Sequence, residues 1–136
     1  MKYKILDKIT SDVMFEVYGK DKKELFQNAA EALFSVISEI KKVKAEERIK
    51  VNVKGKDLKD LLYNWLQELI ARVDIEEMFF SKFDIKKISD KVLEADIYGE
   101  TTSKEKSGTV VKAVTYFEFK LEKTDKGYKA VYSVDI

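Results

Sequence analysis

Two long segments of the chain carry apolar side chains at every third or fourth position, and this spacing limits the fold more than any other feature. In a helix such residues form a stripe along one side, which must be buried against another element. Asp21 and Glu24 stand in the positions of a capping box before the first segment, and Asp57 opens the second. We therefore expect two amphipathic helices. The stripes are Leu25, Phe26, Ala29, Ala30, Leu33, Phe34, Ile37 and Ile40, then Leu58, Leu61, Leu62, Trp65, Leu66, Leu69, Ile70 and Val73.

The rest of the chain alternates apolar and polar residues in short runs, as β-strands with one buried face do. The runs fall at residues 2–5, 12–19, 48–55, 79–88, 92–100, 110–123 and 128–136. We expect a single α+β domain over residues 1–136, with two layers: two amphipathic helices packed on one face of a mainly antiparallel sheet. The residues expected in its core include Leu33, Phe34, Leu62, Trp65, Leu69, Phe117, Phe119 and Tyr132.

The composition excludes several kinds of chemistry. The chain has no cysteine and no histidine, which rules out Ser-His-Asp and Cys-His catalysis and zinc sites built on those ligands. Any metal must be held by oxygen atoms, which favours calcium, magnesium or manganese. Lys and Arg number 26 against 25 Asp and Glu, so net charge gives no general attraction to nucleic acid. With no apolar run of membrane-spanning length and no signal-peptide pattern, we expect no membrane partner and a cytoplasmic location.

The last two strands are joined by a turn sequence at residues 124–127, which fixes their pairing if the loop has two residues. Lys123 then lies opposite Tyr128. Continued without interruption, this register puts Tyr116 opposite Asp135 on a polar face of the sheet.

Asp135 is followed by Ile136, so its side chain lies next to the terminal carboxylate. The same register puts Lys112 and Val114 on the side of Asp135. An acidic residue at a strand end is most often simply hydrated, but two carboxylates held in an ordered strand repel each other unless a cation or a basic side chain offsets their charge. A hydrated strand end and an ion site therefore both remain open on residue pattern alone.

Other features give weaker signals. The lysine-rich stretches around Lys41, Lys54 and Lys104 are interleaved with acidic residues, which favours hydrated surface over RNA contacts. Trp65 lies within a helix stripe, so we expect it in the core and not on a base-stacking surface. No direct sequence-specific nucleic-acid binding is expected.

Several segments, in order along nearly the whole chain, resemble the archease family. They are "TSDVMFEVYG", "KDKKELFQNAAEALFSVI", "VKGKDLKDLLYNWLQELI", "YGE", "VKAVTY" and the final "VDI". The pairing of "KAVTY" with a terminal "DI" is the most specific of these. The resemblance implies an accessory protein without catalytic residues of its own, which promotes guanylylation and turnover of an RtcB-type RNA ligase in tRNA splicing or RNA repair.

The resemblance also implies the site residues. The family's divalent metal corresponds to Asp12, Asp135 and the terminal carboxylate of Ile136, with calcium as first choice and magnesium or manganese as alternatives. Lys112 corresponds to the lysine associated with ligase activation. The family usually has histidines where this chain has Ile9 and Phe117. We infer that these two residues contact each other and have exchanged a polar contact for an apolar one.

Two other functions remain as hypotheses. The first is a chaperone-like binding protein for a tRNA methyltransferase, in which the metal has no role. The second is a metal-dependent hydrolase, although no second acidic residue shows a sign of a raised pKa in the sequence.

Overall fold

The computed structural model describes residues 1–8 and 11–136, and the side chains of this part other than those of Asp7, Lys8 and Phe117. The predictions about Ile9 and the side chain of Phe117 therefore lie outside the described residues. Two antiparallel sheets and two long helices make up the described part. The first sheet has the order β1 (Tyr3–Lys8), β2 (Asp12–Gly19), β7 (Gly127–Asp135), β6 (Ala113–Thr124). The second has the order β3 (Glu47–Lys54), β5 (Val92–Thr101), β4 (Met78–Ile88). The helices are α1 (Lys22–Ile37) and α2 (Leu58–Glu76), and short 3₁₀ turns cover Ile40–Lys42 and Lys104–Lys106.

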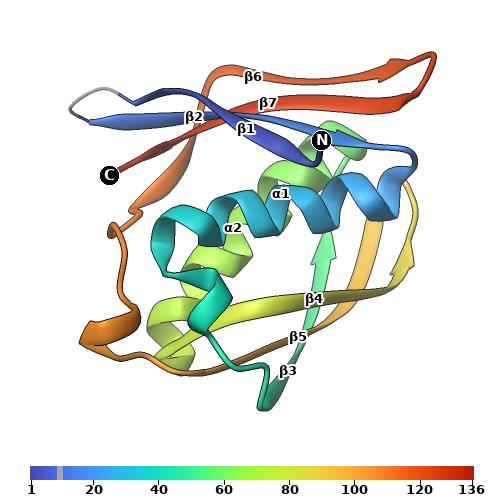
Figure 1. Ribbon diagram of the computed structural model, residues 1–136. Coiled ribbons are helices and arrows are strands. Elements are labelled where there is room, and N and C mark those ends of the chain that lie inside the picture. The colour runs from blue at the N-terminus through green and yellow to red at the C-terminus, as the bar shows by residue number, and fades with distance from the viewer. Residues whose placement is uncertain (9–10) are drawn as a thin grey trace.

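The two helices lie between the two sheets (Figure 1), and each contacts strands of both. The α+β class and the antiparallel pairing are as predicted, but the strands form two sheets and not the one predicted sheet with both helices on one face. The difference follows from the burial of α1. Besides its apolar stripe, this helix buries Asn28 and Ala32, so it has covered surface on two sides.

Both helices begin in the same way, and both predicted N-caps are confirmed. The Asp21 carboxylate accepts the Glu24 N–H at 2.8 Å, and the Asp57 carboxylate accepts the Asp60 N–H at 2.8 Å. In each case a free N–H of the first turn is satisfied by a side chain that the sequence places immediately before the helix. The acidic residue in the first turn also accepts a backbone N–H from before the cap: Glu24 from Lys20, and Asp60 from Lys56.

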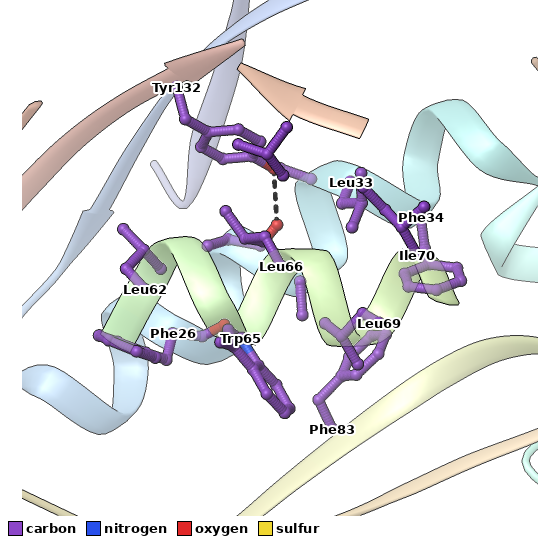
Figure 2. Close-up of a cluster of buried hydrophobic side chains, with 14 of the residues drawn as sticks. Phe26, Leu33, Phe34, Leu62, Trp65, Leu66, Leu69, Ile70, Phe83 and Tyr132 are labelled. Atoms are coloured by element: carbon purple, nitrogen blue, oxygen red, sulfur yellow. Dashed lines mark hydrogen bonds between the residues drawn. The ribbon is translucent and has the colours of Figure 1, made fainter. Parts of the chain in front are cut away.

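The core is continuous through the helix layer. Leu33, Phe34, Leu62, Trp65 and Leu69 are fully buried, as predicted, and so is Tyr132 of β7, while Phe119 is 4% exposed. Figure 2 shows Tyr132 on one side of the helices and Phe83 of β4 on the other. The Tyr132 hydroxyl donates to the Ala29 carbonyl oxygen of α1 at 2.9 Å, which satisfies the one polar atom that this ring buries.

The final hairpin follows the predicted register only near its turn. Lys123 pairs with Tyr128, and the pairing continues as predicted to Lys120 and Val131. Thr115, five residues before Lys120, then lies opposite Ser133, only two residues after Val131. Three extra residues thus bulge from β6, so the predicted pairing of Tyr116 with Asp135 is wrong: Asp135 faces Ala113.

Contacts from α2 account for the bulge. Val114 donates its N–H to the Gln67 side-chain oxygen at 2.9 Å, and its carbonyl oxygen accepts the Tyr63 hydroxyl at 3.4 Å. The Tyr63 ring also stacks on that of Tyr116, with centroids 4.2 Å apart. Because an odd number of residues is inserted, Val114 turns into the core opposite Val134 and is 4% exposed, contrary to its predicted place beside Asp135.

Candidate metal centre

Asp12 and Asp135 lie directly opposite each other on neighbouring strands. They form the first pair of the β2–β7 ladder, at the end of the sheet where the chain terminates (Figure 1). The next pair, Val13 and Val134, is fully buried against the helices. Because side chains alternate along a strand, both aspartates point to the outer face of the sheet. The two acids that the family resemblance assigns to one site thus lie on one face of two neighbouring strands.

The backbone hydrogen bonds show that this is the closer of the two kinds of antiparallel pair. Ile136 donates its N–H to the Ser11 carbonyl oxygen at 2.9 Å, so the bond flanks the Asp12–Asp135 pair and does not join its two members. In such a non-hydrogen-bonded pair the Cα atoms are only about 4.5 Å apart and the side chains are correspondingly close. Two carboxylates are thus held together by the ladder itself.

No basic side chain neutralises this pair within the described part of the chain. No ion pair within 4.0 Å joins Asp12, Asp135 or the terminal carboxylate to a described lysine or arginine. Glu16, further along the outer side of β2, differs in this respect. It lies 3.4 Å from the Lys4 ammonium and 3.6 Å from that of Lys129.

The pKa of Asp12 is raised above its ordinary value. Partial burial is the largest cause, and a hydrogen bond with the Asp135 carboxyl and the charge of that group add to it. All three causes disfavour a second negative charge at this place. A divalent cation would act in the opposite direction, because positive charge next to carboxylates stabilises their ionised form.

The donor set fits a hard cation. Asp12 and Asp135 supply side-chain oxygen atoms, and the backbone of Ile136 is fixed beside them through its bond to Ser11. Calcium, magnesium and manganese prefer such oxygen ligands, and water completes their coordination shells. The described residues contain no group of three or more acidic side chains that could hold a metal. The family resemblance assigns the third ligand to the terminal carboxylate of Ile136, and the backbone of this residue lies beside the acidic pair.

Lys112 lies near this pair through its backbone. Its N–H donates to the Asp135 carbonyl oxygen at 2.8 Å, and its residue is exposed. An uninterrupted register would pair Tyr116 with Asp135 and so put Lys112 past the end of the last strand, whereas the three-residue bulge brings Lys112 beside Asp135. Asp12, Asp135, Ile136 and Lys112 are therefore grouped at one end of the first sheet.

Sequence reasoning missed two features. The Ser11 carbonyl, which fixes Ile136, is a backbone atom and carries no residue signal. A group of lysines at the opposite end of the same sheet was also missed, because its members come from two segments about 100 residues apart and form no run in the sequence.

Within the described residues, no helix is both long and apolar enough to cross a membrane.

Comparison with known proteins agrees with this fold. The family model described as "Archease protein family (MTH1598/TM1083)" matches residues 3–136. The chain is 40% identical over 131 residues to a protein archease of Sulfurisphaera tokodaii, covering 93% of this chain and 94% of that protein. It is 38% identical over 143 residues to one of Archaeoglobus fulgidus, covering 100% of both.

Two solved structures are also similar. The solution structure of Methanobacterium thermoautotrophicum protein 1598 gives a TM-score of 0.76 at 30% identity, covering 99% of this chain and 97% of that one. A Thermotoga maritima crystal structure described as "an archease, possible chaperone" gives a TM-score of 0.70 at 18% identity, covering 96% and 94%, which supports the fold alone. With the family model matching nearly its whole length and relatives at about 40% identity, this chain belongs to the archease family.

Proposed function

We propose that this chain is a cytoplasmic accessory protein that activates an RtcB-type RNA ligase, promoting its GTP-dependent guanylylation and turnover. The proposal includes a divalent metal held by Asp12, Asp135 and the terminal carboxylate of Ile136, and a role for Lys112 in activating the partner. One observation carries it: two aspartates are placed opposite each other by the strand ladder, with no described basic side chain to neutralise them.

Membership of the archease family supplies the partner, because ligase activation is what the resemblance of the sequence implies. The geometry supplies a reason for the acidic pair. Holding two carboxylates together without a counter-charge costs free energy, so a purely structural role does not explain it. When bound, the cation supplies positive charge that offsets this repulsion. The strand ladder holds the two ligands Asp12 and Asp135 opposite each other, and the Ile136–Ser11 hydrogen bond keeps the last residue in place.

Lys112 suits a contact with a partner protein. It is exposed, its backbone is anchored to Asp135, and it makes no ion pair with a described acidic side chain. A lysine fixed at its backbone but free at its ammonium group can bind an anionic group on another molecule. The ammonium is therefore available to the ligase or to its bound nucleotide.

The direct test is multiple-turnover RNA ligation by the cognate ligase with GTP and metal, with and without this protein. We expect stimulation by the wild type and a weaker effect from Lys112→Ala, Asp12→Asn and Asp135→Asn. Adding one residue after Ile136 should also weaken stimulation, since it moves the carboxylate roughly 3.3 Å along the strand. Asp84→Asn, which alters an acidic pair in the other sheet, is the matched control and should stimulate like the wild type. Absence of stimulation by the wild type would reject the proposal.

The alternative is a chaperone-like role toward a tRNA methyltransferase, and the description of the Thermotoga maritima relative as a possible chaperone is what favours it. This alternative needs the fold but not the metal. It predicts that Asp12→Asn and Asp135→Asn protect such an enzyme from aggregation as well as the wild type does. It also predicts that neither the wild type nor these variants stimulate the ligase.

A further inference from the structure

Five lysines line an open hollow of about 670 Å³ at the end of the first sheet away from the acidic pair. Lys20 lies just before α1 and Lys22 and Lys23 lie in its first turn, whereas Lys123 and Lys126 come from the β6–β7 hairpin. In Figure 1 the start of α1 and this hairpin turn lie on the side opposite the C-terminus.

Close backbone packing fixes these two segments against each other. Gly127 closes the hairpin with φ of 132°, a conformation that other residues rarely adopt. A Cβ atom placed on it would meet the Gly19 carbonyl oxygen of the turn before α1, at 2.3 Å. Only glycine therefore allows the two turns this close together, and the grouping of the lysines is a property of the fold.

The charges in the hollow are only partly neutralised. Lys22 pairs with Asp90 at 2.6 Å, Lys20 lies 4.0 Å from the Glu24 carboxylate, and the Asp21 carboxylate is engaged as the cap of α1. Lys23, Lys123 and Lys126 make no ion pair within 4.0 Å in the described part of the chain. The lining includes two aspartates, Asp21 and Asp125, against the five lysines. Asp90 and Glu24 offset two of these lysines from outside the lining, so a small net positive charge remains.

An aromatic side chain adds a second kind of surface. Tyr128, partly buried, lines the same hollow and lies close enough to Lys22 to influence it electrostatically. Lysines that contact phosphates, together with an aromatic face on which a base can stack, are the usual components of single-stranded nucleic-acid sites. An acidic peptide would engage the lysines but would leave the ring without a stacking partner.

We propose that this lysine hollow binds single-stranded RNA through its phosphodiester backbone, without reading its sequence. The inference goes beyond the proposed ligase activation and does not depend on it. The hollow and the acidic pair lie at the two ends of β2, which spans roughly 23 Å from Asp12 to Gly19. RNA held at one end would therefore leave the Asp12–Asp135 end free for a protein partner.

The test is fluorescence anisotropy of a labelled 20-nucleotide oligouridylate with the isolated full chain, over a range of potassium chloride concentrations. Lys123→Gln/Lys126→Gln removes two phosphate contacts. Counterion release predicts that binding weakens about 25-fold at 0.1 M salt and that the slope of log K against log salt falls by about 1.4. Lys41→Gln/Lys59→Gln removes the same charge from exposed sites outside the hollow and should leave binding unchanged.

Substitutions of Tyr128 test the stacking contact independently of the lysines. Tyr128→Leu removes the ring and should weaken RNA binding about fivefold or more, whereas Tyr128→Phe keeps the ring and should keep the affinity. Circular dichroism and melting temperature establish that each variant is folded. The proposal is overturned if the wild type fails to bind RNA at 0.05 M salt, or if both lysine variants weaken binding equally. Displacement of RNA by polyglutamate, inorganic phosphate or phosphatidylglycerol vesicles at matched charge concentration would equally overturn it, since the occupant would then be any polyanion.

Discussion

Each of the two sheets places a pair of aspartates directly opposite each other on neighbouring strands: Asp12 with Asp135 in the first, and Asp84 with Asp96 in the second. The second pair is surrounded by cations. The Lys86 ammonium lies 2.7 Å from the Asp84 carboxylate, and the Arg48 guanidinium lies 4.0 Å from that of Asp96.

Asp12 and Asp84 consequently differ in the direction of their pKa shifts. The hydrogen bond from Lys86 is the main cause that lowers the pKa of Asp84, whereas partial burial and Asp135 raise the pKa of Asp12. Directly opposed aspartates thus have cationic neighbours in one sheet, and in the other have no ion pair with a described lysine or arginine. What distinguishes them is the set of neighbouring cations, which a local sequence pattern does not reveal.

The largest expected loss of stability comes from a core residue that belongs to neither acidic pair. Leu62 is fully buried between the helices and the sheets, so Leu62→Ala should lower the free energy of unfolding by about 2–5 kcal/mol. Urea denaturation followed by circular dichroism measures this. A loss below about 0.5 kcal/mol, typical of surface sites, would mean that the core is not packed as described.

The next effect separates the two acidic pairs by their response to metal. A cation that binds only the folded chain should stabilise the wild type by about 2.7 kcal/mol at a hundredfold excess over its dissociation constant. Asp135→Asn should lose this gain and Asp96→Asn should keep it. Melting curves with calcium, magnesium or manganese against chelator measure the difference. Equal loss in both variants, or no shift in the wild type, would remove the distinction between the pairs.

The third effect concerns acid. Because the folded pKa of Asp84 lies below its unfolded value near 3.9, its ion pair contributes stability above that value, and this contribution is lost as pH falls toward the folded pKa. Asp84→Asn should therefore lose less stability than the wild type between about pH 5 and pH 3. Urea midpoints at the two pH values provide the measurement. Parallel curves for the two proteins would show that Lys86 does not hold the Asp84 carboxylate in solution.

The smallest effect should come from Lys112. Since its ammonium is unpaired among the described residues, Lys112→Ala should change stability by no more than about 0.5 kcal/mol, whereas Lys86→Ala should be the more destabilising of the two. Thermal melting of both variants in chelator tests this. A proportional fall in stability and in ligase stimulation for Lys112→Ala would assign that lysine a structural role.

The sequence predicted what depends on local spacing. Helix caps at Asp21 and Asp57 and the Lys123–Tyr128 register beside the hairpin turn follow from residues within a few positions of one another. The family resemblance, which assigns Asp12 and Asp135 to one metal site, implied that these residues lie close together, and the ladder places them opposite each other.

What could not be predicted depends on contacts between distant segments. The bulge in β6 is supported by Tyr63 and Gln67, which lie about 50 residues earlier on α2. The division into two sheets depends on the second buried side of α1, where Asn28 looks like a surface residue in the sequence. The lysine hollow depends on the backbone contact between Gly19 and Gly127. None of these contacts leaves a periodic pattern.

Trp65 gives the molecule an internal optical probe. It is the only tryptophan in the chain, it is fully buried, and its indole N–H donates to the Phe26 carbonyl oxygen at 3.0 Å. An indole kept from water emits at shorter wavelength than a hydrated one, so emission should shift to longer wavelength when α1 and α2 separate. Because neither the acidic pair nor the lysine hollow includes this ring, ligand titrations that leave the helix layer intact should leave the emission maximum in place. Intrinsic fluorescence can therefore report unfolding separately from binding, without any added label.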